Sequence, residues 1–199
     1  AATSRFPTDY GVRLADVDFY RGGEDVILAN GAVGIYENSA RLAQVSIGQN
    51  DVAATPLQMA LVAAAIANNG QIMVPYVVQE LTGADGTSYG ATEEQLWRQA
   101  LRPSSADVLR AAMVEVAANG TARNMAVDGL VVGGKTGTAQ LGTDPPNSHA
   151  WIVGFAGTEG GVAELAIAVI VEAQEGASEQ TGGVVAAPIA RAVIEAYFS

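Results

Sequence analysis

Few side chains in this sequence can take part in ionic chemistry, and the most suggestive of them stand in one glycine-rich run. Lys135 is the only lysine among 199 residues, His149 is the only histidine, and there is no cysteine. The lysine belongs to the run Gly133-Gly134-Lys135-Thr136-Gly137-Thr138. An ammonium group beside hydroxyls and glycines suits the binding of an anion. That anion can be a phosphate or a carboxylate, and each needs a different local structure.

The phosphate interpretation rests on residues 129–136, which match the P-loop pattern of glycine, four residues, glycine, lysine and a hydroxyl residue. A P-loop holds phosphate because its lysine and hydroxyl begin a helix whose amides point at the anion. Here Gly137, Gly142 and the pair Pro145-Pro146 follow closely, and these residues disfavour a helix. Residues 130–132 favour a strand. The sequence therefore disfavours a P-loop ATPase. We rank it third, below the two functional hypotheses that the rest of the sequence supports.

The carboxylate interpretation requires the same run on a strand that borders an active site, as in the Lys-Thr-Gly element of serine acyl-transfer enzymes that open β-lactams. Lys135 would supply positive charge near a substrate carboxylate, and the neighbouring hydroxyls would hydrogen-bond to it. Gly137 would let a substrate backbone lie against the strand. The amide of Thr138 would polarise an acyl carbonyl as half of an oxyanion hole. Alone, this triplet fits a solvated lysine in a glycine-rich hairpin equally well.

We therefore name Lys135 and Thr138 as candidate catalytic residues, and Lys135, Thr136, Gly137 and Thr138 as candidate substrate-binding residues. Other polar residues give weaker signals. His149 has no acid close to it in sequence, which favours a structural histidine at a strand end over a Ser-His-Asp triad. Nothing gives the paired carboxylates metal-ligand spacing. We expect no metal and no cofactor.

The loop after the Lys-Thr-Gly run carries Asp144, Asn147 and Ser148, which either flank a cleft or form a solvated turn. Further along, Trp151 and Phe155 lie on the same face of an expected strand, because successive side chains point to opposite faces. We expect both aromatic side chains in the core rather than in a ligand site.

Composition excludes several classes of protein. Hydrophobic residues make up 49% and charged residues 16%, which excludes intrinsic disorder. A net charge of −11 disfavours nucleic acid and anionic lipid as partners. The longest uncharged stretch, residues 52–79, has a continuous apolar centre only at residues 59–67, shorter than the roughly 20 residues that span a bilayer. We expect a chain that does not itself span a membrane.

Two helices precede the Lys-Thr-Gly run. Thr55-Pro56-Leu57-Gln58 is a capping box, and it opens a helix that stops at Asn68-Asn69-Gly70. Because this helix is apolar all round, we expect it to be buried on every side. A second helix begins at Pro103-Ser104 and stops at Asn119-Gly120. Its expected apolar face comprises Val108, Leu109, Ala112, Met113 and Val116.

Strands dominate the rest of the chain. Between the two helices, a short strand pair is expected around residues 72–81 and after the turn at 83–86. Residues 130–138, 151–156 and 164–171 predict three consecutive strands, and a helix closes the chain over residues 184–198. The short links predict antiparallel pairing with helices on the faces, which is an α+β fold. Residues 1–45 have no sustained period and are expected to be irregular.

Several segments share the order found in penicillin-binding proteins. Residues 46–51, 54–60, 65–70 and 120–122 precede the Lys-Thr-Gly run, and residues 149–155 and 186–190 follow it. Over residues 46–199 the chain resembles the monofunctional, class B type of high-GC Gram-positive bacteria. The resemblance implies the penicillin-binding, serine β-lactamase-like fold and a serine-type D,D-transpeptidase that cross-links peptidoglycan. It also implies D-Ala-D-Ala stem peptides and β-lactams as ligands, and a parent protein anchored at the extracytoplasmic face of the bacterial membrane by an N-terminal segment outside this sequence.

Two motifs of that family are missing. Members acylate a serine in a Ser-x-x-Lys motif, and a Ser-x-Asn motif helps to move protons. With Lys135 the only lysine, the first motif cannot occur here, and the second does not occur either. Because both lie upstream in the family, we expect residues 1–199 to be the C-terminal portion of a transpeptidase domain. Its partner would be the missing N-terminal portion, and the chain alone would be inactive. The alternative is a catalytically silent binding or scaffold module of the same fold.

Overall fold

The structure, a computed structural model, describes residues 26–27, 33–34, 44, 47–49, 52–144, 146–174 and 180–199. Its helical elements are α2 (Pro56–Ala67), α3 (Pro103–Asn119), the 3₁₀ turn η2 (Arg123–Met125), the π turn η3 (Gly182–Ala186) and α4 (Ala187–Phe198). Its strands are β1 (Val26–Ile27), β2 (Val33–Gly34), β3 (Gln71–Met73), β4 (Glu80–Thr82), β5 (Ser88–Ala91), β6 (Leu96–Gln99), β7 (Leu130–Gln140), β8 (Ser148–Thr158) and β9 (Leu165–Val171).

The central sheet has the order β7-β8-β9, and both pairings are antiparallel. Lys135 lies in the middle of β7, opposite Val153 of β8. The prediction that the lysine stands on a strand antiparallel to the 151–156 segment is confirmed. A helix starting at Thr136, which a P-loop requires, is not formed because residues 130–140 are one continuous strand. The P-loop hypothesis is therefore excluded.

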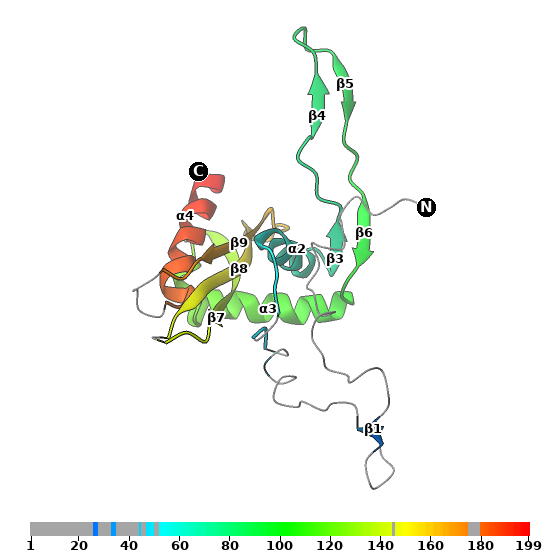
Figure 1. The fold of residues 1–199 in the computed structure, drawn as a ribbon. Helices are drawn as coiled ribbons and strands as arrows, with labels where there is room; N and C mark the ends of the chain where they lie inside the picture. Colours follow the sequence, from blue (N-terminus) through cyan, green and yellow to red (C-terminus); the bar gives the residue numbers. More distant parts are fainter. Residues whose placement is uncertain are drawn as a thin grey trace.

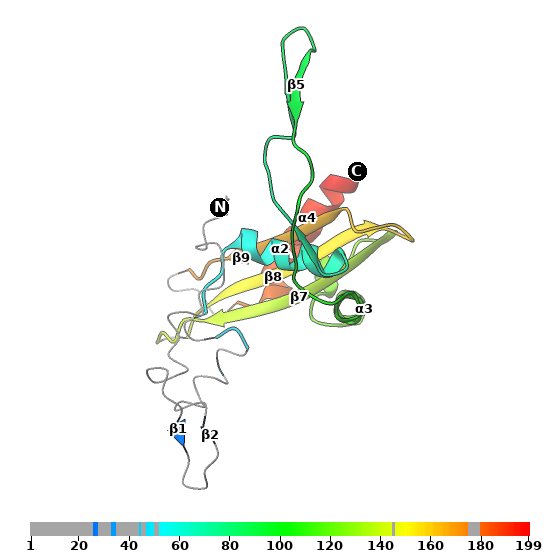
Figure 2. The same ribbon diagram turned by 90° about the vertical axis from the view of Figure 1, so that its right-hand side faces the viewer.

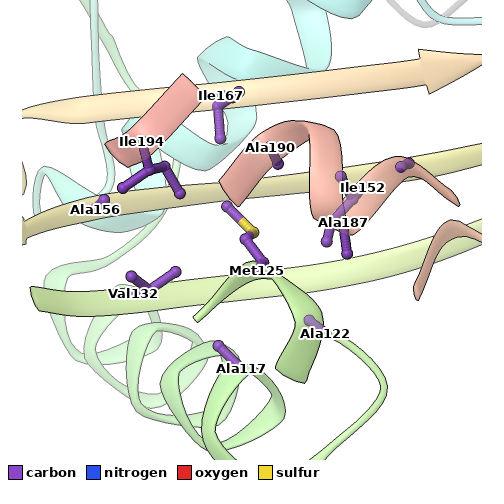
Figure 3. Packing of buried hydrophobic residues seen from close by; sticks show 11 residues of the cluster. Ala117, Ala122, Met125, Val132, Ile152, Ala156, Ile167, Ala187, Ala190 and Ile194 are labelled. Atoms are coloured by element: carbon purple, nitrogen blue, oxygen red, sulfur yellow. The ribbon is translucent and has the colours of Figure 1, made fainter. Parts of the chain in front are cut away.

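Helices cover both faces of this sheet, as the α+β prediction required. In Figure 1 the sheet lies between α4 and α2, and α3 runs along β7. The core on the α4 side joins side chains from all three strands to η2 and α4; Figure 3 shows Met125, Val132, Ile152, Ile167 and Ile194 converging there. A second cluster on the α2 side contains Ile66, Ala67, Met113 and Phe155. These two layers hold β7 in place, and no strand of the described residues pairs with its outer edge.

Helix α2 begins and ends where the sequence predicts. The Thr55 side chain accepts a hydrogen bond from the Gln58 N–H at 3.3 Å, and Gln58 Oε1 accepts one from the Thr55 N–H at 2.7 Å. Asn69 and Gly70 then take left-handed φ angles of 50° and 82°. The expectation of burial on every side is wrong for the described residues, because Leu57 and Val62 are each 42% exposed. An all-apolar pattern does not reveal which side of a helix packs against the rest of the protein.

The capping box makes a stability prediction. Replacing Thr55 with alanine removes the side-chain acceptor of the Gln58 N–H, which we expect to cost about 1 kcal/mol in free energy of unfolding. For a domain of this size the melting temperature should fall by roughly 2–4 °C. Thermal melts of Thr55→Ala and Thr55→Ser measure the effect. Equal destabilisation by serine, which keeps the hydroxyl, would contradict the assignment of the cap.

Helix α3 has the predicted bounds, but its buried face matches the prediction only in part. The buried residues are Ala106, Met113 and Ala117. Val108 is 70% exposed and Leu109 is 40% exposed, so the face that the sequence predicted is wrong at both positions. Ala112 is exposed as well, whereas Met113 is buried as predicted. Contact with β7 and its neighbours, and not the pattern of the helix alone, selects the side of α3 that is buried.

The segment between α2 and α3 forms an extended hairpin arm that stands away from the sheet (Figures 1 and 2). β3 pairs with β6, and β4 pairs with β5 across the predicted turn at residues 83–86. All residues of β4, β5 and β6 are exposed. The predicted strand pair is thus split into two short pairs.

The expected irregular segment, residues 1–45, falls mostly outside the described residues. Within it, β1 and β2 pair antiparallel. Across the described ranges, no helix is both long enough and apolar enough to cross a membrane.

Candidate active site

The Lys-Thr-Gly run occupies the outer strand of the sheet and presents side chains on both of its faces. Directly opposed residues of an antiparallel pair share a face, and successive residues alternate. Lys135 and Gly137 oppose Val153 and Trp151, on the side of α2. Thr136 opposes Ile152, which packs in the core on the α4 side. The ammonium and the Thr136 hydroxyl therefore reach the free edge of β7 from opposite faces.

The N–H and C=O groups of successive β7 residues point alternately toward β8 and away from it. Gln49 Nε2 donates to the carbonyl of Thr138 at 2.9 Å, and the Gln140 N–H donates to Gln49 Oε1 at 3.3 Å. These two backbone groups therefore face away from β8. In an antiparallel ladder the N–H and C=O of a residue point the same way, and the direction alternates along the strand. The N–H groups of Thr136 and Thr138 thus point to the free edge, as an oxyanion-hole donor at Thr138 requires.

Lys135 brings a positive charge to this edge. Its Nζ donates to the carbonyl of Thr136 at 2.5 Å, and its side chain is exposed. Among the described residues, no acidic side chain forms a salt bridge with it. The ammonium therefore keeps hydrogen-bonding capacity for an incoming anion, since it has three N–H donors.

A groove of about 440 Å³ adjoins the run on the α2 side. It is lined mainly by apolar side chains, and among the described residues that line it Lys135 is the only charged one. Four lining residues precede α2, namely residues 47, 48, 52 and 54. The others are Met59 and Val62 of α2, residues 135–139 of β7, and Trp151 and Val153 of β8. The expectation for the two aromatic residues is half right, because Phe155 is buried whereas Trp151 lines the groove. An apolar groove with a few polar groups is the usual form of a small-ligand site.

The segment before β7 supports the Lys-Thr-Gly run from the α4 side. Thr121 Oγ1 lies 2.8 Å from Thr136 Oγ1. Asn124 Nδ2 donates to the carbonyl of Gly183 at 2.8 Å, which joins η2 to η3. In the sequence, residues 120–122 stand out only as part of an ordered set of motifs. Their contact with Thr136 is a feature that local patterns could not supply.

The other candidate residues have structural roles. His149 Nδ1 accepts a hydrogen bond from the Ala173 N–H at 2.9 Å, as expected of a structural histidine at a strand end. The Ser148 hydroxyl is buried and donates to the carbonyl of Gln180 at 2.9 Å. Asn147 Nδ2 donates to the carbonyl of Gln174 at 2.8 Å. Asp144 is exposed. None of these four residues lines the groove.

Comparison with known proteins identifies the family. The model of the penicillin binding protein transpeptidase domain matches residues 19–195. The chain belongs to this family, and the resemblance seen in its sequence is confirmed. It is 43% identical over 171 residues to peptidoglycan D,D-transpeptidase PbpA of Mycolicibacterium smegmatis, covering 85% of this chain and 34% of that protein. It is 31% identical over 193 residues to stage V sporulation protein D of Bacillus subtilis, covering 93% and 28%.

Solved structures agree on the fold. The penicillin G acyl-enzyme complex of penicillin-binding protein A from M. tuberculosis matches with a TM-score of 0.68 and 41% identity, over 88% of this chain and 38% of that chain. PBP2 of Pseudomonas aeruginosa matches with a TM-score of 0.61 and 30% identity, over 82% and 34%. The penicillin-binding fold is thereby confirmed. This chain spans about a third of the length of the mycobacterial PbpA proteins that it matches.

Proposed function

We propose that this chain forms the substrate-binding side of a peptidoglycan D,D-transpeptidase site, which takes D-Ala-D-Ala stem peptides and β-lactams. The observation that carries the proposal is the free edge of β7. There Lys135 stands beside a groove, and the N–H groups of Thr136 and Thr138 point away from β8. A substrate backbone can add to such an edge by main-chain hydrogen bonds. The acyl-enzyme complexes of the M. tuberculosis relative support β-lactams as ligands.

The residues of β7 would act on an acyl-transfer reaction. A serine hydroxyl gives up its proton as its oxygen bonds to the carbonyl carbon of the substrate, and the carbonyl oxygen becomes negative. The carbonyl then forms again as the carbon–nitrogen bond breaks, and the leaving nitrogen takes up the proton that the serine gave up. The Thr138 N–H stabilises the negative oxygen, and Lys135 stabilises both that charge and the substrate carboxylate. Thr136 binds the substrate, and Gly137 lets the substrate backbone lie against the strand. A second amine then attacks the acyl carbon and displaces the serine. The new amide bond is the cross-link.

The nucleophile has to come from outside this sequence. No Ser-x-x-Lys and no Ser-x-Asn motif occurs in the chain. We place both motifs in an N-terminal portion of the same transpeptidase domain, with residues 1–199 as its C-terminal portion. The coverage of the relatives, 34% of PbpA, supports this division. We place the parent protein at the extracytoplasmic face of the membrane, with its anchor outside this sequence, because peptidoglycan is cross-linked there.

Covalent labelling tests the proposal. The protein that carries the complete domain should form one acyl adduct per molecule with a labelled penicillin, on a serine outside residues 1–199. The 199-residue chain alone should form none, because no serine here is paired with an activating lysine. Intact-mass and peptide mass spectrometry measure both results. An adduct on a serine within residues 1–199 would contradict the assignment of the nucleophile.

The same experiment distinguishes the transpeptidase from the alternative, a catalytically silent binding or scaffold module. A complete, folded domain that binds penicillin reversibly and forms no adduct would be a catalytically silent binding module. A complete domain that neither binds nor reacts would contradict the proposal for β7 as well. Circular dichroism of each sample serves as the folding control.

A further inference from the structure

Gln49 makes a two-point contact with the free edge of β7. Its Nε2 donates to the carbonyl of Thr138, and its Oε1 accepts from the N–H of Gln140, across 89 and 91 residues of sequence. One carboxamide thus satisfies an acceptor and a donor that lie two residues apart on the strand, as a neighbouring strand would. The contact closes the edge at the point where the Lys-Thr-Gly run ends.

A turn presents Gln49 to the strand. The carbonyl of Gln44 accepts hydrogen bonds from the N–H groups of Ile47, at 3.2 Å, and Gln49, at 3.0 Å. Gly48 between them has a φ of 78°, a left-handed conformation that glycine adopts without steric cost. The Gln44 carbonyl therefore restrains the backbone that carries the Gln49 side chain. This arrangement suits a carboxamide that must keep one orientation.

The position of Thr138 depends on its neighbours. On one side Gly137 faces β8, opposite Trp151. On the other side the carbonyl of Thr138 is held by Gln49 at 2.9 Å. Glycine has more conformational freedom than any other residue, so Gly137 by itself restrains the following N–H weakly. The Thr138 N–H therefore lies between two restrained backbone groups: Gly137, which pairs with β8, and the Thr138 carbonyl, which the Gln49 carboxamide holds.

We propose that Gln49 is a positioning residue that fixes the Thr138 N–H for oxyanion stabilisation. The proposal rests on the function proposed above. Gln49 carries no charge, and both polar ends of its side chain bond to β7, so it acts through Thr138 and not on the substrate. An oxyanion donor acts only where the negative oxygen develops, and a displacement of about 1 Å can cost about 10²-fold in rate. Gln49 therefore affects the acylation step more than ligand binding.

The test uses the protein that carries the complete transpeptidase domain, with penicillin G as the probe. Gln49→Met keeps the length of the side chain and removes both hydrogen bonds. Gln49→Glu keeps an acceptor for the Gln140 N–H and removes the donor to Thr138. Gln99→Met is the matched control, because Gln99 Nε2 also donates to backbone carbonyls, those of Asn69 at 2.9 Å and Leu101 at 2.6 Å, away from the groove.

Stopped-flow kinetics should separate the two steps. We expect both Gln49 variants to lower the acylation rate constant about tenfold or more, with the dissociation constant of the non-covalent complex changed less than about twofold. Gln99→Met should leave both constants within about twofold. Hydrogen exchange should be faster at the Gln140 amide in Gln49→Met, where its acceptor is lost, than in the wild type.

The outcomes distinguish this proposal from the proposed function. A wild-type protein that forms no adduct would overturn both. A wild-type protein that is acylated, together with Gln49 variants acylated at the same rate, would overturn only the role of Gln49. Binding and acylation that weaken in parallel would overturn it too, because they would indicate general damage to the site. If Gln49→Met does not fold, Gln49→Glu decides by the same measurements.

Discussion

Replacing Lys135 with alanine is expected to slow acylation of the complete protein by a β-lactam about 10²–10³-fold, the usual loss when one electrostatic donor is removed from an acyl-transfer site. The ammonium stands at the free edge of β7 and borders the groove. A β-lactam or a peptide terminus brings a carboxylate there, and its carbonyl oxygen becomes negative during attack. The chain has no second lysine to replace the lost charge.

The fold should survive this change, because the Lys135 side chain is exposed and buries little apolar area. Thr138→Ala should slow acylation less, since its backbone N–H remains when the hydroxyl is lost. The measurement is the second-order acylation rate constant of the wild type and both variants, with thermal melts as a control. Equal rates for wild type and Lys135→Ala at equal melting temperatures would show that Lys135 is a solvated strand residue without a catalytic role.

Replacing Phe155 with alanine should lower the free energy of unfolding by about 3–5 kcal/mol, the usual cost of removing a buried aromatic side chain. Phe155 is 2% exposed and packs with Ile66 and Met113, so it joins β8 to α2 and α3. Its ring lies over Gly133 of β7, where an added Cβ would come within 2.2 Å of the ring. The ring therefore holds the strand that carries Lys135 as well as the two helices.

Chemical denaturation of the complete protein measures this cost, and the melting temperature should fall by roughly 10 °C. Tyr89→Ala is the control, because Tyr89 is 75% exposed on β5, and it should change the stability by less than about 0.5 kcal/mol. A loss below about 1 kcal/mol for Phe155→Ala would mean that the ring does not join these layers in the native protein.

Local chemistry determined the boundaries of the elements. The capping box at Thr55 and the left-handed stop at Asn69 involve groups within a few residues of one another, so their patterns predict the ends of α2. The assignment of Lys135 to a strand followed from the glycines and prolines after it, which disfavour the helix of a P-loop. The antiparallel pairing of β7 with β8 followed from the short link between them.

Long-range packing decided what those patterns left open. The pattern of α3 correctly favoured Met113 as a buried residue, but it also favoured Val108 and Leu109, which are exposed, and it missed Ala106 and Ala117, which are buried. A helix or strand pattern reveals that an apolar side exists, and the element that packs against it selects the residues that become buried.

The candidate site divides in the same way. The sequence by itself determined which residues form the Lys-Thr-Gly run, its strand conformation and the family of the chain, because these depend on neighbouring residues and on the order of motifs. Only the tertiary structure decided that Trp151 lines the groove and that Thr121 lies beside Thr136. It also decided that Gln49 binds the edge at Thr138, 89 residues away. Such contacts join segments that are distant in sequence, and the folded backbone alone brings their atoms within hydrogen-bonding distance.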